Sequence, residues 1–328
     1  TKINWSGWHH SLHRRMLQKP ELLPDGSELL VAVSGGQDSM ALLALLRDLR
    51  QLHGWSLRLW HGDHGWHQGS SQVVEDLTRW CSNQGFELQT SRAAQSEVGS
   101  EASARAWRYH QLLVSARQNK CDVVTAHTAT DRAETVLLNI ARGCNLQGLS
   151  ALPAQRPLCD QDPDGPQLRR PLMHWTRTDT AQICRDLDLP TWLDPSNSNL
   201  ALARNRIRHT VLPVLDQLHP GSDRRIAQLS EGVAQVRNSQ RQLSHLALQA
   251  IQRLDGLDRQ RLAELDEATS RILLVTWLQE AGGPQLSSTT LEKLNYQLFR
   301  GKASGQFSLS NGWTLSWNPT TIRLAPMK

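Results

Sequence analysis

The 328-residue sequence has no long hydrophobic run. Its longest uninterrupted apolar stretch covers residues 40–46, whereas a helix that crosses a bilayer needs about 20 apolar residues. A membrane-spanning protein is therefore excluded, and we expect no membrane partner. Hydrophobic residues make up 39% of the chain and charged residues 20%, which does not match the composition of a disordered chain. The sequence predicts a folded globular protein.

Cysteine is scarce, and its positions exclude two kinds of cysteine chemistry. The five cysteines are odd in number and widely spaced: Cys81, Cys121, Cys144, Cys159 and Cys184. Disulfide frameworks and zinc sites both need closely patterned cysteines, and no Cys-x-x-Cys pair occurs. We therefore expect a cytoplasmic protein in a reducing environment.

The length of the chain indicates two domains, and its positive charge is compatible with a polyanionic partner. A chain of 328 residues exceeds what one compact core usually spans. Lys and Arg number 36 against 31 Asp and Glu, a formal charge of +5. This excess favours a nucleic-acid partner, because neutralised phosphates release counterions, but it does not establish one.

The first two hundred residues alternate short apolar runs with longer amphipathic stretches. This pattern predicts an α/β fold with a doubly wound, mostly parallel sheet. The expected strands cover residues 29–33, 57–61, 86–90 and 122–126. The expected helices between and after them cover residues 39–52, 72–84, 101–118 and 132–142. Each helix is long enough for a right-handed crossover.

The composition changes after residue 152. Residues 158–167 are rich in Pro, Asp and Gly and are expected to form an exposed loop, followed by helices at 178–187 and 200–210. His219, Pro220 and Gly221 mark the expected boundary between a first domain, residues 1–217, and a smaller, mainly helical second domain, residues 218–328.

The second domain is expected to be helical and to end in a β-hairpin. Helices are predicted over residues 222–254, 268–280 and 288–299. Asn311 and Gly312 separate two strand patterns, and such a turn needs positive φ at both central residues.

A small-residue loop joins the first expected strand to the first expected helix. It consists of Ser34, Gly35, Gly36, Gln37, Asp38 and Ser39. Two glycines let the backbone approach an anion, and the helix N-terminus adds partial positive charge. The loop matches neither the P-loop of kinases nor the Gly-x-Gly-x-x-Gly of dinucleotide folds. A plain turn with Asp38 or Ser39 as N-cap is the alternative, but the flanking strand and helix favour a phosphate site.

This loop resembles the PP-loop of the N-type ATP pyrophosphatases, which cleave ATP between the α and β phosphates. The resemblance implies ATP and Mg²⁺ as cofactors, with residues 34–39 around the pyrophosphate and Asp38 as the metal ligand. The loop alone does not separate the small-metabolite synthetases of this superfamily from its tRNA-modifying enzymes.

The second expected strand ends in His61, Gly62, Asp63, His64 and Gly65. Parallel sheets bind ligands at this edge, and the histidine spacing does not suit a zinc site. The segment resembles the His-x-Asn-His-Gly of tRNA(Ile)-lysidine synthetases, with an aspartate in place of the asparagine. The resemblance implies that the first histidine contacts the nucleotide.

Arg105, Arg108 and Tyr109 share one face of an expected helix. Two guanidiniums there could bind phosphate, and a solvated basic face is the alternative. The segment Ala-Arg-x-x-Arg-Tyr also resembles a lysidine synthetase motif. That resemblance implies that Arg105 binds the nucleotide and that Arg108 and Tyr109 bind substrate.

His127 follows the fourth expected strand, and the next helix contains Asp131 and Glu134 and closes at Arg142. The two carboxylates could form a capping box, or an acidic pair that holds an ammonium or Mg²⁺ at the sheet edge. The segment resembles the Gly-His-x-x-Asp-x-x-Glu-Thr of lysidine synthetases, although Ala126 replaces the glycine. This implies lysine recognition by the histidine and the two acids, and catalytic roles for the acids and the arginine.

Two later segments resemble a lysidine synthetase signature: Asp194-Pro195-Ser196-Asn197 and Arg204-Asn205-Arg206-Ile207-Arg208. Arg204 and Arg208 share a helix face and could clamp phosphate, or they could pair with neighbouring carboxylates. The resemblance implies substrate contacts for Asp194, Asn197, Arg204, Asn205, Arg206 and Arg208.

These motifs together imply an enzyme that joins L-lysine to carbon 2 of the wobble cytidine of a tRNA(Ile) with a CAU anticodon. By resemblance, the tRNA is first adenylated, and AMP and pyrophosphate are released. The resemblance further implies that residues 1–217 form the PP-loop ATP pyrophosphatase catalytic domain and residues 218–328 the tRNA-binding domain. A homodimer is kept open. A tRNA thiolase would need a cysteine pair, a small-metabolite synthetase would not need residues 204–208, and a non-catalytic RNA-binding module would not need the phosphate loop.

Overall fold

The computed structural model describes residues 5–65, 69–94, 97–192 and 199–326. The chain forms two compact units, residues 1–234 and 235–328, and each is described by itself. The division falls within one helix, after the boundary expected at residues 217/218, and the assignment of catalytic and tRNA-binding domains stays a prediction.

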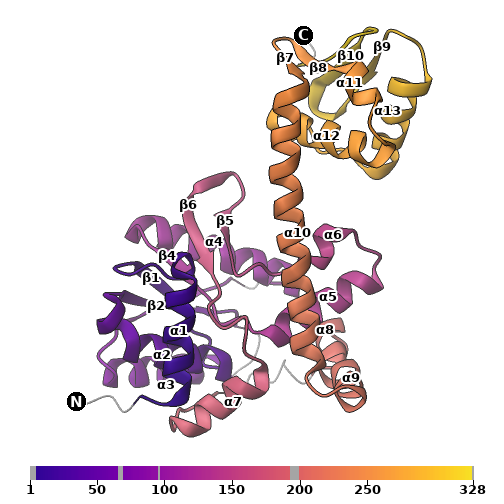
Figure 1. Cartoon of the computed structure of the whole chain (residues 1–328). Coiled ribbons are helices and arrows are strands. Elements are labelled where there is room, and N and C mark those ends of the chain that lie inside the picture. Colours follow the sequence, from indigo (N-terminus) through magenta and orange to yellow (C-terminus); the bar gives the residue numbers. More distant parts are fainter. Residues whose placement is uncertain (1–4, 66–68, 95–96, 193–198, 327–328) are drawn as a thin grey trace. The chain divides into compact units, whose positions relative to one another are not determined.

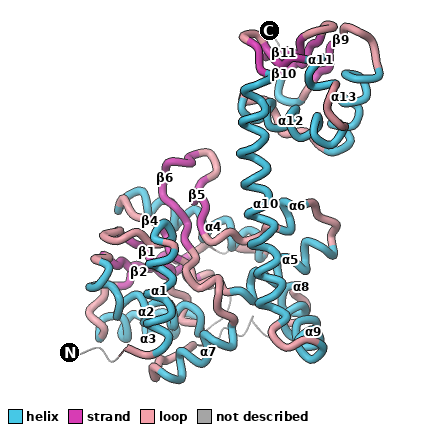
Figure 2. The backbone as a smooth tube through the Cα atoms, viewed as in Figure 1, coloured by secondary structure: helices cyan, strands magenta, loops and turns pink. Residues whose placement is uncertain are grey.

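A six-stranded sheet forms the centre of the first unit, in the order β3-β2-β1-β4-β6-β5 (Figures 1 and 2). Its strands are β1 Glu28–Ala32, β2 Ser56–Asp63, β3 Leu88–Arg92, β4 Asp122–Val124, β5 Gln155–Cys159 and β6 Asp162–Arg169. All neighbours pair in parallel except β5, which runs antiparallel to β6 at the edge. The predicted mostly parallel sheet is confirmed.

Helices cover both faces of this sheet, because successive side chains of a strand point to opposite sides. In β1, Leu29 and Val31 pack in the cluster formed by helices α1, α2, α3 and α7. Leu30 instead packs with residues of α4 in a second cluster. The helices of this unit are α1 Gly7–Gln18, α2 Gln37–His53, α3 Ser70–Asn83, α4 Glu101–Asn119, α5 Ala129–Ala141, α6 Leu146–Leu149, α7 Arg177–Asp186, α8 Ala203–Arg206 and α9 Leu212–Leu218.

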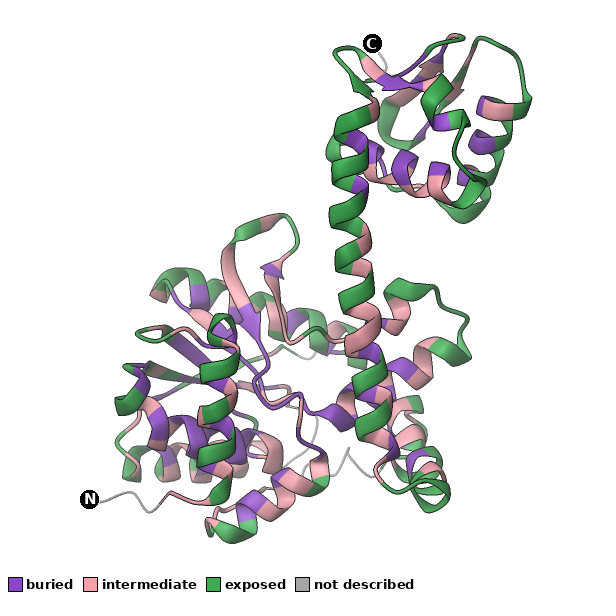
Figure 3. Cartoon of the chain, in the orientation of Figure 1, coloured by how far each residue is buried: buried purple, intermediate pink, exposed green. Residues whose placement is uncertain are grey.

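The apolar run at residues 40–46 belongs to α2, and every side chain in it is fully buried. A helix that is apolar on all sides must be covered on all sides. Helices α1 and α7 and strand β2 all contact α2, and the buried helix appears in purple in Figure 3. The phosphate loop therefore precedes the most deeply buried helix of the unit.

The expected loop at residues 158–167 is wrong, because most of this segment forms the β5–β6 hairpin. Strand β6 pairs with β4 through Val123 and Leu168, and Leu158 and Leu168 are buried against the α4 side of the sheet. The backbone N–H of Gln167 also donates to Asp122 at 2.8 Å. The Pro, Asp and Gly residues that suggested a loop lie largely within β6 itself, at its start, and only residues 160–161 form the turn.

The second unit contains the end of α10 (Ser222–Ile251) and a five-stranded antiparallel sheet in the order β7-β8-β11-β10-β9. Its other elements are β7 Gln252–Arg253, β8 Gly256–Asp258, α11 Arg259–Ala263, α12 Glu267–Glu280, α13 Ser288–Arg300, β9 Gly305–Ser308, β10 Trp313–Trp317 and β11 Thr321–Pro326. Leu257, Leu315 and Ile322 are fully buried in its core.

The predicted hairpin is confirmed, since β9 and β10 pair around Asn311 and Gly312, whose φ angles are 59° and 72°. The expectation of a mainly helical domain that ends in a β-hairpin is confirmed, and β11, β8 and β7 extend this hairpin into a larger sheet that was not expected. Strands of two and three residues are too short to show an alternating pattern. None of the helices in the described ranges is long and apolar enough to cross a membrane.

Candidate functional site

A cavity of about 300 Å³ opens beside the phosphate loop, where β1, β2 and β4 end. Parallel sheets bind their ligands at this edge. Many of the residues singled out from the sequence line it: Ser34, Asp38, Ser39, His61, Arg105, Arg108, Tyr109, His127 and Asp131. Side chains from motifs more than ninety residues apart along the chain thus meet around one space.

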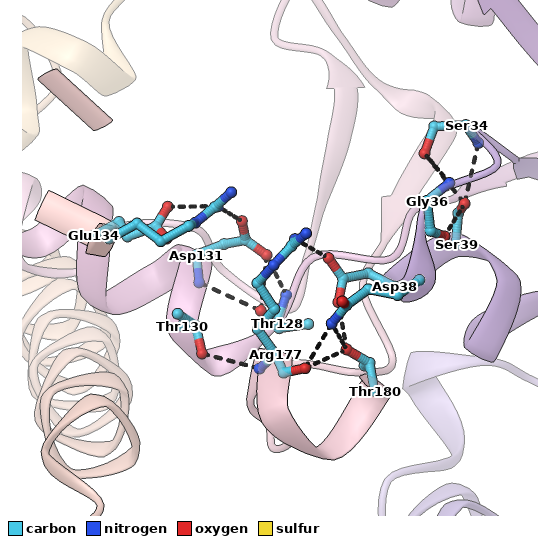
Figure 4. Close-up of polar contacts among 12 residues, drawn as sticks. Ser34, Gly36, Asp38, Ser39, Thr128, Thr130, Asp131, Glu134, Arg177 and Thr180 are labelled. Atoms are coloured by element: carbon cyan, nitrogen blue, oxygen red, sulfur yellow. Dashed lines mark hydrogen bonds and ion pairs between the residues drawn. The ribbon is translucent and has the colours of Figure 1, made fainter. Parts of the chain in front are cut away.

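The phosphate loop leads directly into α2, with Gly36 as the N-cap. Among the described residues no side chain caps the first turn, so the alternative with Asp38 or Ser39 as the N-cap is wrong. Ser39 Oγ donates to the Gly36 carbonyl at 2.9 Å and accepts from the Ser34 N–H at 3.1 Å (Figure 4). Gly35 has a φ of +82°, which favours glycine. The uncapped N–H groups fit an anion such as phosphate.

Asp38 points from this loop toward α7. Its Oδ2 accepts a hydrogen bond from Arg177 Nη1 at 2.5 Å, and its Oδ1 accepts one from the Thr180 hydroxyl (Figure 4). Burial raises the pKa of Asp38 above its ordinary value, although Arg177 favours the charged form. Gln37 also faces α7, since its amide donates to the Arg177 carbonyl at 2.7 Å. No sequence signal indicated these partners, which lie about 140 positions from the loop.

Asp131 belongs to the capping box of α5, but its partner is Thr128. The Thr128 N–H and hydroxyl both donate to Asp131 Oδ2 at 2.8 Å (Figure 4). The capping box expected from Asp131 and Glu134 is therefore wrong, because the helix begins at Ala129. Asp131 still lines the cavity, so the cap orients it there.

Glu134 is fully buried and is held by two arginines. Arg204 Nε donates to one carboxylate oxygen at 2.7 Å, and Arg208 Nε donates to the other at 2.6 Å. Both guanidiniums also lie 3.4 Å from Asp131 Oδ1. Arg204 and Arg208 therefore share a face, as predicted, and pair with neighbouring carboxylates. Their phosphate clamp stays a prediction.

His61 and Asp63 shape the end of β2. The His61 Nδ1 lies 2.8 Å from the Val33 carbonyl, which requires an Nδ1–H donor, and burial lowers the pKa of this histidine. The Gly65 N–H donates to Asp63 Oδ1 at 2.8 Å. An asparagine could accept the same bond, which explains physically why aspartate is accommodated where the related motif has asparagine.

Tyr109 is surrounded by cations. The Arg105 and Arg156 guanidiniums lie 4.9 and 5.5 Å from its ring centroid. Burial would raise the pKa of Tyr109, but Arg105 and Arg170 outweigh it and lower the pKa. This phenol lines the cavity as a strong hydrogen-bonding group.

Several predicted residues lie away from the cavity lining. Arg142 is exposed at the C-cap of α5, Arg206 is exposed, and buried Asn205 donates to the Asn199 carbonyl at 2.9 Å. Asp194 and Asn197 lie outside the described residues. The roles assigned to all of these residues stay predictions.

Sequence reasoning missed Trp192 and Arg170. Trp192 lines the cavity, and its backbone N–H donates to the Gly35 carbonyl at 2.9 Å. Arg170 is buried behind His127. A tryptophan or an arginine in a region read as turn and loop carries no local signal of a site.

Comparison with known proteins assigns the chain to a family. A PP-loop domain model matches residues 9–215, and a TilS substrate binding domain model matches residues 257–323. The tRNA(Ile)-lysidine synthase of Parasynechococcus marenigrum (strain WH8102) is 53% identical over 324 residues, which cover 99% of this chain and 96% of that protein. The chain belongs to the tRNA(Ile)-lysidine synthase family. It is accordingly a ligase that uses ATP and acts on tRNA.

A further relative supports this assignment, and a solved structure shares the fold. The tRNA(Ile)-lysidine synthase of one strain of Prochlorococcus marinus is 43% identical, with 99% of this chain and 98% of that protein covered. A U34-tRNA thiolase from Methanococcus maripaludis superimposes with a TM-score of 0.58 at 18% identity, covering 69% of this chain and 79% of that chain. At this identity the thiolase shows only that the fold is shared.

Proposed function

We propose that this lysidine synthase family member joins L-lysine to carbon 2 of the wobble cytidine of a tRNA(Ile) with a CAU anticodon. ATP first adenylates the 2-carbonyl oxygen and releases pyrophosphate. The lysine ε-nitrogen then forms a bond to carbon 2, and the carbon–oxygen bond breaks as AMP leaves. The observation that supports this proposal is that the phosphate loop and Asp131 line the same cavity.

The phosphate loop would hold the departing pyrophosphate. The uncapped first turn of α2 offers N–H donors, which stabilise negative charge as it develops. Arg105 and Arg108 line the same cavity and could bind phosphate oxygens. Mg²⁺ at phosphate sites usually takes one or two carboxylates together with phosphate oxygens, so Asp38 suits it once the nucleotide is present. The ion would neutralise charge on the pyrophosphate.

Asp131 is the group best placed to bind the lysine ammonium. Burial would raise its pKa, but Arg204, the hydrogen bond from the Thr128 N–H and Arg208 favour the charged form, and the pKa is lowered, so the carboxylate stays ionised. A carboxylate with a lowered pKa is a weak base. It therefore forms an ion pair with the lysine ammonium more readily than it removes a proton from it. Glu134 is fully buried with both oxygens bound to arginines, so we assign it the role of holding Arg204 and Arg208.

The direct test incubates the protein with ATP, radiolabelled lysine and the minor isoleucine tRNA, and measures label in RNA. We expect the isoleucine tRNA to be labelled only when ATP is present. Asp131→Asn should abolish this labelling, and a methionine tRNA with a CAU anticodon should not be labelled. ATP–pyrophosphate exchange that never depends on tRNA would contradict this proposal and indicate a small-metabolite synthetase. Cytoplasmic location and a homodimer stay predictions.

The phosphate clamp has its own test. Replacing Arg204 and Arg208 together with Gln should weaken tRNA binding and flatten its dependence on salt, because fewer counterions would be released. Replacing Arg58 and Arg79 together with Gln is the matched control, because both are exposed, both lie outside the cavity lining and the expected tRNA-binding domain, and their replacement removes the same charge. If the salt dependence of tRNA affinity does not change, the two arginines do not bind tRNA phosphates and act only through their contacts with Asp131 and Glu134.

A further inference from the structure

Arg170 is a buried guanidinium that lies directly behind a cavity residue. Its side chain is 1% exposed, and its Nη1 donates to the Pro153 carbonyl at 2.6 Å. Its Nε lies 3.3 Å from Nδ1 of His127, and the Thr125 hydroxyl lies 2.9 Å from the same nitrogen. One ring nitrogen of His127 therefore faces two groups that can donate.

The chemistry of the guanidinium determines where the imidazole proton lies. Arginine is always protonated in proteins, and its nitrogens donate but do not accept hydrogen bonds. A contact from Arg170 Nε to Nδ1 thus requires Nδ1 to carry a lone pair. The single proton of the neutral ring must then be on Nε2.

Nε2 is the ring nitrogen that remains for a ligand in the cavity. His127 lines this cavity beside Asp131, and its Nε2 makes no hydrogen bond within the described ranges. The charged groups around His127 are the cations Arg170, Arg204 and Arg105 and the anion Asp131. Burial, followed by Arg170, lowers the pKa of His127 well below its ordinary value, so the ring stays neutral at neutral pH.

We propose that Arg170 is a positioning residue that holds His127 as the neutral Nε2–H tautomer, so that His127 donates a hydrogen bond to an anionic oxygen in the cavity and does not exchange a proton. This inference rests on the proposed function in one respect: the oxygen belongs either to an ATP phosphate or to the lysine carboxylate. Both are anionic acceptors for an N–H donor.

Nuclear magnetic resonance tests the tautomer without any substrate. Two-bond ¹H–¹⁵N correlation spectra of histidine-labelled protein distinguish Nδ1–H, Nε2–H and cationic rings, and the signal absent from His127→Gln identifies this residue. We expect the Nε2–H pattern to persist from about pH 6 to 8. An Nδ1–H ring, or titration of His127 near pH 6.5, would overturn the proposal even if lysidine formation is demonstrated. Conversely, failure of lysidine formation leaves this readout unaffected.

Two substitutions at His127 test the donor. The Gln amide N–H reaches the place of Nε2, whereas the Asn amide N–H reaches the place of Nδ1. We expect His127→Asn to lower kcat/KM by about 100-fold, the usual effect of losing one oriented donor, and His127→Gln to retain most of it. Equal losses in two folded variants would contradict the donor role. A rise in KM for ATP or for lysine identifies which oxygen is bound.

Variants behind the ring test the role of Arg170. Thr125→Val keeps the guanidinium and should keep the Nε2–H pattern, whereas Arg170→Met should admit the other tautomer. Arg170 also donates a hydrogen bond to the Pro153 carbonyl, so its replacement can lower stability. The thermal unfolding temperature of each variant is therefore measured as well. If Arg170→Met does not fold, Arg170→Lys, which keeps a cationic donor, should preserve the Nε2–H pattern. Loss of that pattern in Thr125→Val would overturn the assignment to Arg170.

Discussion

The Arg177 guanidinium lies 2.5 Å from the Asp38 carboxylate and thereby joins the start of α7 to the phosphate loop. Asp38 also accepts a hydrogen bond from Thr180, and Arg177 donates its backbone N–H to Thr130 of α5 at 3.0 Å. The orientation of the proposed metal ligand is therefore set by helices distant from it in the sequence.

Removing this cation should destabilise the first unit. Arg177→Met leaves the largely buried Asp38 charge without its cationic partner, and we expect the free energy of unfolding to fall by about 1–2 kcal/mol at pH 7. Urea unfolding measures it. Arg185→Met, on the same helix but exposed and bonded to Gln182, is the control. Equal losses in both variants would show that the ion pair adds nothing.

Glu134→Gln should reduce stability strongly. Glu134 is fully buried between two guanidiniums, and removing one partner of a buried charge cluster costs about 3–5 kcal/mol. A double-mutant cycle with Arg208→Met should show strong coupling, since both changes break the same bond. Near-normal folding with a raised lysine requirement would instead favour direct lysine binding by Glu134.

The Asp179 carboxylate should make stability depend on pH. Burial opposes ionisation, but Arg224 and the cap with Thr176 outweigh it and lower the pKa of Asp179. A lowered folded-state pKa stabilises above the ordinary carboxyl pKa, and this stability is lost as pH falls through the folded pKa. Asp179→Asn should therefore cost about 1 kcal/mol at pH 7, and this cost should shrink progressively as pH falls below the ordinary carboxyl pKa of about 3.9. Urea unfolding of the wild type and the variant across this pH range measures the difference, and a cost that stays constant with pH would contradict the prediction.

Gly256 should not tolerate a side chain. Its φ is +154°, and a Cβ there would overlap the Ile322 carbonyl oxygen. Gly256→Ala should therefore destabilise the second unit by about 2 kcal/mol or more, as measured by amide hydrogen exchange in β8 and β11. In contrast, Gly232→Ala in α10 has open space around it and should stabilise by about 0.5–1 kcal/mol. Unchanged exchange in Gly256→Ala would contradict the steric argument.

Sequence patterns predicted the helices and strands well where one hydrophobic periodicity runs through the whole element. The strands leading to the phosphate loop and to His61, the helix after that loop, and the turn at Asn311 all follow from spacing within a few residues. The β5–β6 hairpin was missed because its pairing with β4 joins segments more than 40 residues apart.

The sequence indicated which residues belong to the site, but not which of their side chains contact one another. The spacing of Arg204 and Arg208 shows that they share a face, yet it cannot reveal that the face meets Glu134. Arg170 and Arg177 lie in segments whose local composition resembles any surface loop or helix start. Their roles arise only when distant segments fold together, which no periodicity encodes.

The full burial of residues 40–46 has a consequence for altering this enzyme. Because the helix behind the phosphate loop is enclosed on all sides, displacing that loop would require repacking of the surrounding core. Attempts to make the protein accept another amino acid should therefore leave α2 untouched and vary Tyr109 and Trp192, which line the cavity without belonging to the buried cluster around Glu134.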